Sequence, residues 1–140
     1  MKKIVFSLSA FVMCLILASC GNPTSTIVSL TEKIEKQGDE WVDADKWEEA
    51  LTDFAQAYCK FAESDPEEEE FTDFKYAVQD FHSACYAIDN KKAKRARDKA
   101  EKRVDKNKDL EKSMKAATKR LEKMEKKFRK AERDDDNYDE

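Results

Sequence analysis

Residues that break regular structure are scarce in this chain. Its 140 residues include only two glycines and two prolines, whereas 41% of them are charged. Runs in which Val, Ile, Thr and Tyr alternate with polar residues, the usual sign of strands, are also missing. A chain with so few breakers and so many Glu, Lys and Ala residues is expected to be all-α, with long helices and no sheet.

The chain also has few residues of the kinds that carry catalysis or bind metal. It has one histidine, His82, and four cysteines, which together do not make a zinc ligand set. The acidic runs at residues 65–70 and 134–140 lack the glycine that a calcium loop needs at its bend. Glycine-rich phosphate loops and the GxSxG and SxxK motifs are missing too. We therefore expect no enzyme activity, no cofactor and no metal site.

Charge is separated along the chain, although the net charge is only −4. Residues 26–90 contain 18 acidic and five basic residues, and residues 91–133 contain 20 basic and eight acidic ones. Residues 134–140 are acidic again. Such asymmetry indicates either pairing between the two segments or an interaction with a charged partner.

The first twenty residues have the order of a secretory signal peptide. Lys2 and Lys3 precede an apolar run at residues 4–17, and small residues and a cysteine follow. The run is shorter than the roughly 20 residues that a membrane-spanning helix needs. Its end, Leu17-Ala18-Ser19-Cys20, resembles the lipobox of bacterial lipoproteins.

The resemblance implies that residues 1–19 are removed and that Cys20 carries acyl chains such as palmitate, with residues 20–25 as a tether. The expected partner at this end is a membrane of the bacterial cell envelope, and a secreted protein without lipid is the alternative. In the enterobacterial members of this class an aspartate after the cysteine retains the protein at the inner membrane, and Gly21 stands there instead. The acidic cluster of surface-exported lipoproteins is missing as well. The implied location is the outer membrane, facing the periplasm.

Residues 26–133 are enough for one helical domain. We expect helices at about 27–37, 44–63, 66–89 and 91–133, from apolar residues at helical spacing. Gly38 is a candidate end for the first helix, and cap signals stand at Asp45 and at Asp65-Pro66. The second and third helices are expected to form an amphipathic antiparallel hairpin that holds most of the aromatic residues.

The seam of apolar residues at 93–131 predicts a long, basic, coiled-coil-like last helix. Its phase does not continue that of the preceding helix, so a turn is expected at Asp89-Asn90, with Asn90 in the left-handed conformation. Residues 105–109 form the weakest helical stretch and the expected kink. At its length the helix must overhang the hairpin, break or find a partner. Three aspartates from Asp134 are expected to stop it and leave residues 134–140 as an acidic disordered tail.

Cys59 and Cys85 are the two cysteines beyond the lipobox. An oxidising compartment would permit a disulfide, but the hairpin is expected to hold them about 20 Å apart along its axis, against the roughly 7 Å that a disulfide allows. Buried or inert thiols are the preferred interpretation, and intramolecular and intermolecular bridges are the alternatives. His82 lies one turn from Cys85, as a Cys–His nucleophile would require, but a histidine at the edge of a core stripe is the preferred interpretation.

The last helix offers a candidate binding surface. Lys115, Lys119, Lys123 and Lys127 follow one another at i, i+4 steps, where like charges repel. Three explanations stay open. These lysines pair with the acidic hairpin, the narrow Ala/Leu/Met seam binds a protein partner or a second copy, or residues 91–130 bind a polyanion such as anionic lipid, lipopolysaccharide or a cell-wall polymer.

Nucleic acid is not an expected partner, because aromatic residues suited to base stacking are not interleaved with the lysines and the implied location is periplasmic. The sequence as a whole predicts a non-catalytic interaction or structural module of the bacterial envelope. Polyanion binding through the basic helix is the alternative function.

Overall fold

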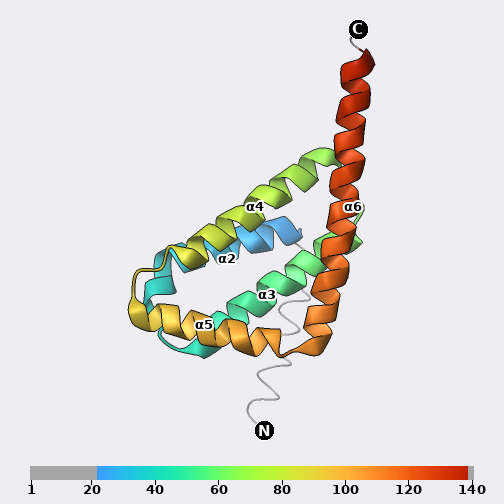
Figure 1. Cartoon of the computed structure of the whole chain (residues 1–140). Helices are drawn as coiled ribbons and strands as arrows, with labels where there is room; N and C mark the ends of the chain where they lie inside the picture. The colour runs from blue at the N-terminus through green and yellow to red at the C-terminus, as the bar shows by residue number, and fades with distance from the viewer. Residues whose placement is uncertain (1–21, 139–140) are drawn as a thin grey trace.

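The computed structural model describes residues 22–138, and this part of the chain is a small all-α bundle, as the sequence predicts (Figure 1). The described residues contain no strand. Residues 1–21, which include the predicted signal peptide and Cys20, and residues 139–140 lie outside this range. The elements are, in order, α2 (Pro23–Gln37), the 3₁₀ turn η1 (Gly38–Glu40), α3 (Ala44–Glu63), α4 (Glu68–Tyr86), α5 (Lys91–Asp105) and α6 (Lys108–Tyr138).

Helices α3 and α4 form the antiparallel hairpin that the aromatic residues predict. Phe54 stacks on Phe81 with ring centroids 4.1 Å apart, and Phe61 stacks on Phe74 at 3.8 Å. All four side chains are buried. Aromatic rings bury large apolar areas, so these two pairs are the centre of the hydrophobic core.

The ends of the hairpin helices differ in part from those expected. Helix α3 spans 44–63 as predicted, but its cap is Asp43, whose carboxylate accepts the Asp45 N–H at 3.1 Å. Helix α4 was expected at 66–89 and spans Glu68–Tyr86, because residue 67 is still extended. Pro66 therefore precedes the helix instead of opening it.

Helix α2 begins four residues earlier than the expected start at residue 27. Asn22 caps it by accepting the Ser25 N–H at 2.8 Å, and Pro23 occupies the first turn, where a missing N–H costs nothing. Ile27 and Ile34 are fully buried. Residues 23–25, which the sequence assigned to a tether, are therefore helical.

Gly38 ends α2 as predicted, but close packing explains the glycine here. Its φ is −57°, which any residue adopts. A Cβ at this position would lie 2.6 Å from Cδ1 of Ile88 and 3.2 Å from Cγ2 of Ile34. After this turn, the Trp41 carbonyl accepts the indole N–H of Trp47 at 2.8 Å, which joins η1 to the start of α3.

The expected single helix at 91–133 is two helices. Helix α5 ends at Asp105, and α6 begins at Lys108, so the break at Lys106-Asn107 falls within the predicted kink. The predicted turn before α5 is present, but Asn90 is not left-handed. Its φ is −68°, and its side chain caps α5 by accepting the Lys92 N–H at 2.9 Å.

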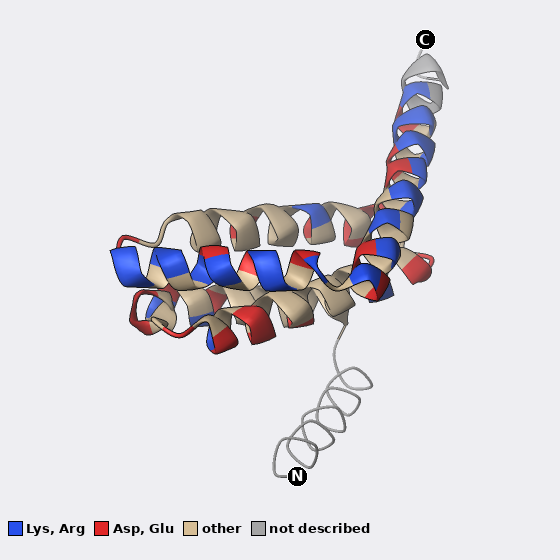
Figure 2. Cartoon of the chain, turned by 60° about the horizontal axis from the view of Figure 1, so that its bottom comes forward, with Lys and Arg blue, Asp and Glu red and all other residues tan. Residues whose placement is uncertain are grey.

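Helix α3 lies at the centre of the bundle. Helix α2 packs against α3 and α4 on one side, and α5 and α6 lie on the other (Figures 1 and 2). Helix α6 crosses the hairpin near the α3–α4 connection, and its C-terminal part projects beyond the other helices (Figure 1). The expected helix at 91–133 is thus broken into two, and its second part extends beyond the hairpin.

The three aspartates from Asp134 do not stop α6, which continues to Tyr138. The predicted disordered tail at 134–140 is therefore helical as far as the structure describes it. Among the described residues, no helix is long and apolar enough to cross a membrane.

The stacked pairs predict which position of α4 matters most for stability. Phe81→Ala should lower the free energy of unfolding by about 3 to 5 kcal/mol, because it removes a buried ring and leaves a cavity. Tyr76→Ala on the same helix removes a ring that is 62% exposed and should change stability by no more than about 0.5 kcal/mol. Chemical denaturation followed by circular dichroism measures both values. Equal losses in the two variants would contradict this description of the core.

Candidate functional site

The two basic helices place few of their positive charges against the acidic hairpin. Helix α5 turns Ala93, Ala96 and Ala100 toward the core, all at most 6% exposed. Small side chains allow two helix backbones to approach closely. The apolar seam, and not the basic face, therefore decides how α5 packs on α3.

Two arginines of α5 are exceptions to this outward arrangement. Arg97 is buried, and its guanidinium donates to the backbone carbonyl of Cys85 at the end of α4. Arg103 donates to the carboxylates of Asp45 and Glu48 at 2.8 and 3.2 Å. These contacts bind α5 to the ends of the hairpin helices.

Helix α6 turns its apolar seam inward as well. Met114, Leu121, Met124 and Phe128 pack against the core, and the Phe128 and Phe71 rings lie 5.3 Å apart. The seam that was a candidate surface for a protein partner thus contacts the chain's own hairpin.

The four candidate lysines of α6, Lys115, Lys119, Lys123 and Lys127, are all exposed. The hypothesis that they pair with the acidic hairpin is wrong for the described residues. Lys115 pairs with Glu111 of its own helix at 3.1 Å, and Lys127 lies 5.9 Å from the centre of the neighbouring Phe128 ring. An ion pair between α6 and the hairpin has the opposite polarity: Glu125 of α6 pairs with Lys75 of α4 at 3.1 Å.

Further lysines extend this surface along α6. Figure 2 shows Lys and Arg along much of the helix as it leaves the bundle. We call this surface the basic ridge, and it consists of the exposed residues Lys112, Lys115, Lys119, Lys123, Lys126, Lys127 and Lys130. It is a straight line of positive charge about 27 Å long at 1.5 Å per residue. Like charges at i, i+4 raise one another's energy, and a bound polyanion would relieve that repulsion.

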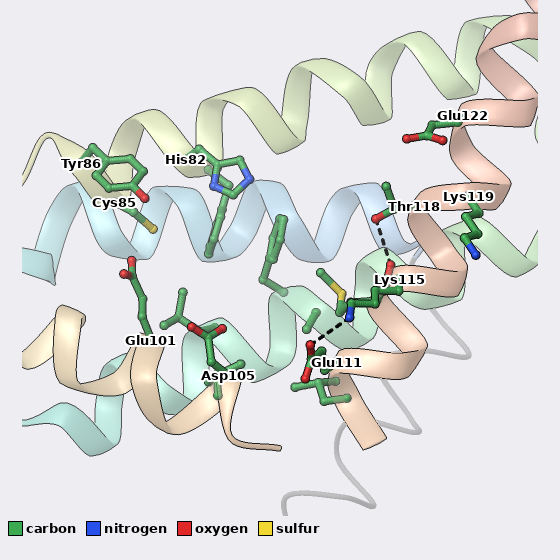
Figure 3. Close-up of a pocket in the computed structure, with 17 residues that line it drawn as sticks. His82, Cys85, Tyr86, Glu101, Asp105, Glu111, Lys115, Thr118, Lys119 and Glu122 are labelled. Atoms are coloured by element: carbon green, nitrogen blue, oxygen red, sulfur yellow. Dashed lines mark hydrogen bonds and ion pairs between the residues drawn. The ribbon is translucent and has the colours of Figure 1, made fainter. Parts of the chain in front are cut away.

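A groove lies beside the ridge, between α4, α5 and α6, with α3 as its floor (Figure 3). It has a volume of about 650 Å³. Its apolar lining includes Leu51, Phe54, Phe81, Leu110 and Met114. Its rim is charged and includes Glu101, Asp105, Glu111, Lys115, Lys119 and Glu122.

Burial shifts the titration of several groups in this groove. It raises the pKa of Glu101, although Arg97 opposes the shift. It raises the pKa of Cys85 to about 12, again against Arg97. His82 keeps an exposed side chain, but the rings of Phe54 and Phe81 partly desolvate its imidazole, which lowers its pKa.

His82 and Cys85 both line this groove, but the arrangement opposes a Cys–His nucleophile. The thiolate is the reactive form of cysteine, and a pKa of about 12 keeps Cys85 protonated near neutral pH. Cys59 is half-buried, with its sulfur 3.7 Å from that of Met114, and burial raises its pKa too. Both thiols are free, which agrees with the preferred interpretation of buried or inert cysteines.

Among the side chains that the structure describes, no three from His, Cys, Asp or Glu come together in a way that would hold a metal ion. The acidic run at residues 65–70 places its last three carboxylates in the first turn of α4. Negative charge is favourable there because it faces the positive end of the helix dipole.

Comparison with known proteins adds no relative: no protein-family model matches the chain, and neither curated proteins nor solved structures gave a match.

The single histidine allows one direct test of the groove. The imidazole of His82 should titrate below 6.5 in the folded protein, because burial disfavours its charged form. The unfolded chain then binds this proton more tightly, so the neutral imidazole favours folding above pH 6.5. That contribution is lost as the pH falls through the folded pKa.

Nuclear magnetic resonance of the imidazole protons, in buffer and in denaturant, measures both midpoints without ambiguity. A folded midpoint at or above the denatured one would contradict the described packing of His82.

Proposed function

We propose that the chain is a lipid-anchored bacterial lipoprotein, held through Cys20, whose helical domain is a non-catalytic module that binds a polyanion of the cell envelope. The anchor is supported by the lipobox-like sequence Leu17-Ala18-Ser19-Cys20 and the apolar run before it. An outer-membrane location facing the periplasm goes with this proposal.

The single observation that carries the binding function is the outward position of the basic ridge. Its four candidate lysines form no ion pair with the hairpin among the described residues. The apolar seam on the other side of α6 packs against the hydrophobic core. Exposed lysines keep their positive field in solution, and a line of them attracts a chain of negative charges at long range. Of the three explanations that the sequence leaves open, polyanion binding has the most support from this geometry.

The ligand chemistry that suits the ridge is repeated phosphate or carboxylate. Lysine acts as a flexible point charge toward such groups and does not require one fixed geometry. The ridge would therefore bind polymers or arrays of anions with little selectivity for their detailed structure. Lipopolysaccharide phosphates, anionic cell-wall polymers and anionic lipid headgroups all offer this chemistry.

The anchor predicts a simple genetic result. Cys20→Ala should abolish incorporation of labelled palmitate and stop removal of residues 1–19, because the lipid-bearing thiol is lost. Ser19→Ala, which keeps a small residue before the cysteine, should label and mature normally. Normal labelling of Cys20→Ala would contradict the anchor.

Polyanion binding predicts a salt-dependent interaction that needs the ridge. The probe is inorganic polyphosphate, added to a form that lacks residues 1–20. The binding constant K falls as salt rises. Replacing Lys115, Lys119, Lys123 and Lys127 by glutamine should make the slope of log K against log salt less steep by roughly 3, since each phosphate contact contributes about 0.7 to 0.9. A matched control makes the same change of charge at exposed lysines away from α6, at Lys33, Lys36, Lys46 and Lys91.

Titration calorimetry at several salt concentrations gives both slopes. Equal losses in the ridge variant and the control, or no binding by the original protein at low salt, would exclude the ridge as the binding surface.

A further inference from the structure

The start of α2 limits how far the folded domain can move from a lipid on Cys20. Asn22 already belongs to the fold, because its side chain accepts the Ser25 N–H and its carbonyl accepts the Thr26 N–H. Gly21 is the one residue between Asn22 and Cys20. Two residues of chain span at most about 7 Å even when fully extended.

Helix α2 cannot act as a flexible extension of this short connection. Ile27 and Ile34 are fully buried in the core, and Thr31 between them is 6% exposed. Releasing α2 from the bundle would expose both isoleucines, which costs roughly 1.5 to 3 kcal/mol for each. A lipid on Cys20 would therefore keep the start of α2 within about 7 Å of the lipidated residue.

The part of α2 next to the connection has an unusual surface for this chain. Residues 22–31 contain no charged side chain, although 41% of the whole chain is charged. Ser25, Val28 and Ser29 share one exposed face of the helix, opposite Ile27 and Ile34, and Val28 is 43% exposed. The same face carries charge only from the exposed Glu32 onward, one turn further from the connection. We call these three residues the α2 outer face.

The uncharged end of this face, next to the connection, suits close contact with a bilayer. Moving a charged group toward the low-dielectric region of a membrane is unfavourable, whereas small hydroxyls and a valine enter the headgroup region at little cost. Two independent observations therefore favour a bilayer as the partner of this surface. The first is the connection of one residue, and the second is the uncharged stretch directly after it.

We infer that the α2 outer face rests on the bilayer in which Cys20 is anchored, an inference that rests on the proposed lipid anchor. Helices α5 and α6 lie on the other side of the α3–α4 hairpin from α2 (Figures 1 and 2). The basic ridge is then presented away from the anchoring leaflet. Its polyanion is a polymer of the envelope that approaches from the aqueous side, and not the headgroups of that leaflet.

Thiol labelling of the full-length lipidated protein tests this orientation. Val28→Cys and Lys119→Cys are each placed in phosphatidylcholine vesicles and treated with a bulky, water-soluble maleimide. The native thiols give a low background, because burial raises the pKa of both Cys59 and Cys85. The matched control carries twelve Gly/Ser residues between Gly21 and Asn22, which keeps the anchor and frees the domain.

We expect Val28→Cys to react roughly tenfold more slowly with the native connection than with the long one, since contact with the headgroups excludes a bulky reagent. Lys119→Cys should react at the same rate in both. Equal rates for Val28→Cys, or protection of Lys119→Cys instead, would overturn the orientation.

Flotation of the protein with the vesicles reports the anchor separately, with Cys20→Ala as the unanchored reference. Protein that floats while Val28→Cys stays fully reactive contradicts the orientation alone. Protein that does not float contradicts the proposed anchor, and the orientation with it.

Discussion

The stacked phenylalanine pairs between α3 and α4 are the interaction on which the rest of the structure depends. Their rings occupy the space between the two helices and fix the antiparallel register of the hairpin. The remaining helices pack onto this frame with smaller side chains, Ile27 and Ile34 from α2 and three alanines from α5. Because the large rings are concentrated in one layer, the outer helices need only a narrow apolar stripe each, and their other faces are free to carry charge.

The charge separation along the sequence does not result in the basic helices neutralising the acidic hairpin. Opposite net charges in the two halves suggest that they attract, but taking lysines out of water costs more than most surface ion pairs return. Apolar seams therefore set the rotation of α5 and α6, and the lysines remain outside. Arg103 pairs with Asp45 and Glu48, and Glu125 pairs with Lys75, all with side chains at least 33% exposed. The ridge lysines stay exposed, so the positive field of α6 persists in solution.

Apolar spacing and cap residues predicted most of the helices, but they could not predict contacts between residues far apart in the sequence. The hairpin and the turn near Asn90 follow from apolar spacing and caps. The weak helical stretch at 105–109 gave the place of a kink, where the structure has a break between two helices. The early start of α2 was missed, although Asn22-Pro23 is a cap followed by a first-turn proline and carried the signal. Sequence could not show that Asp39 accepts the N–H groups of Asp89 and Asn90, fifty residues away. The exposure of the ridge and the groove beside it depend on how α6 crosses the hairpin, which no local pattern encodes.

The proposed anchor on Cys20 and the fold would constrain each other, because only Gly21 lies between Cys20 and Asn22. A long, flexible connection would let the domain tumble above the bilayer, so that any surface could meet any partner. With a lipid on Cys20, a connection of one residue would remove that freedom, and the protein surface nearest the bilayer would have to tolerate contact with it. In a chain as highly charged as this one, an uncharged first two turns of α2 satisfy that requirement at the point where it arises. In the proposed orientation the basic ridge would lie in the aqueous space. There its line of lysines could attract a polyanion without being neutralised by the lipids of the anchoring leaflet.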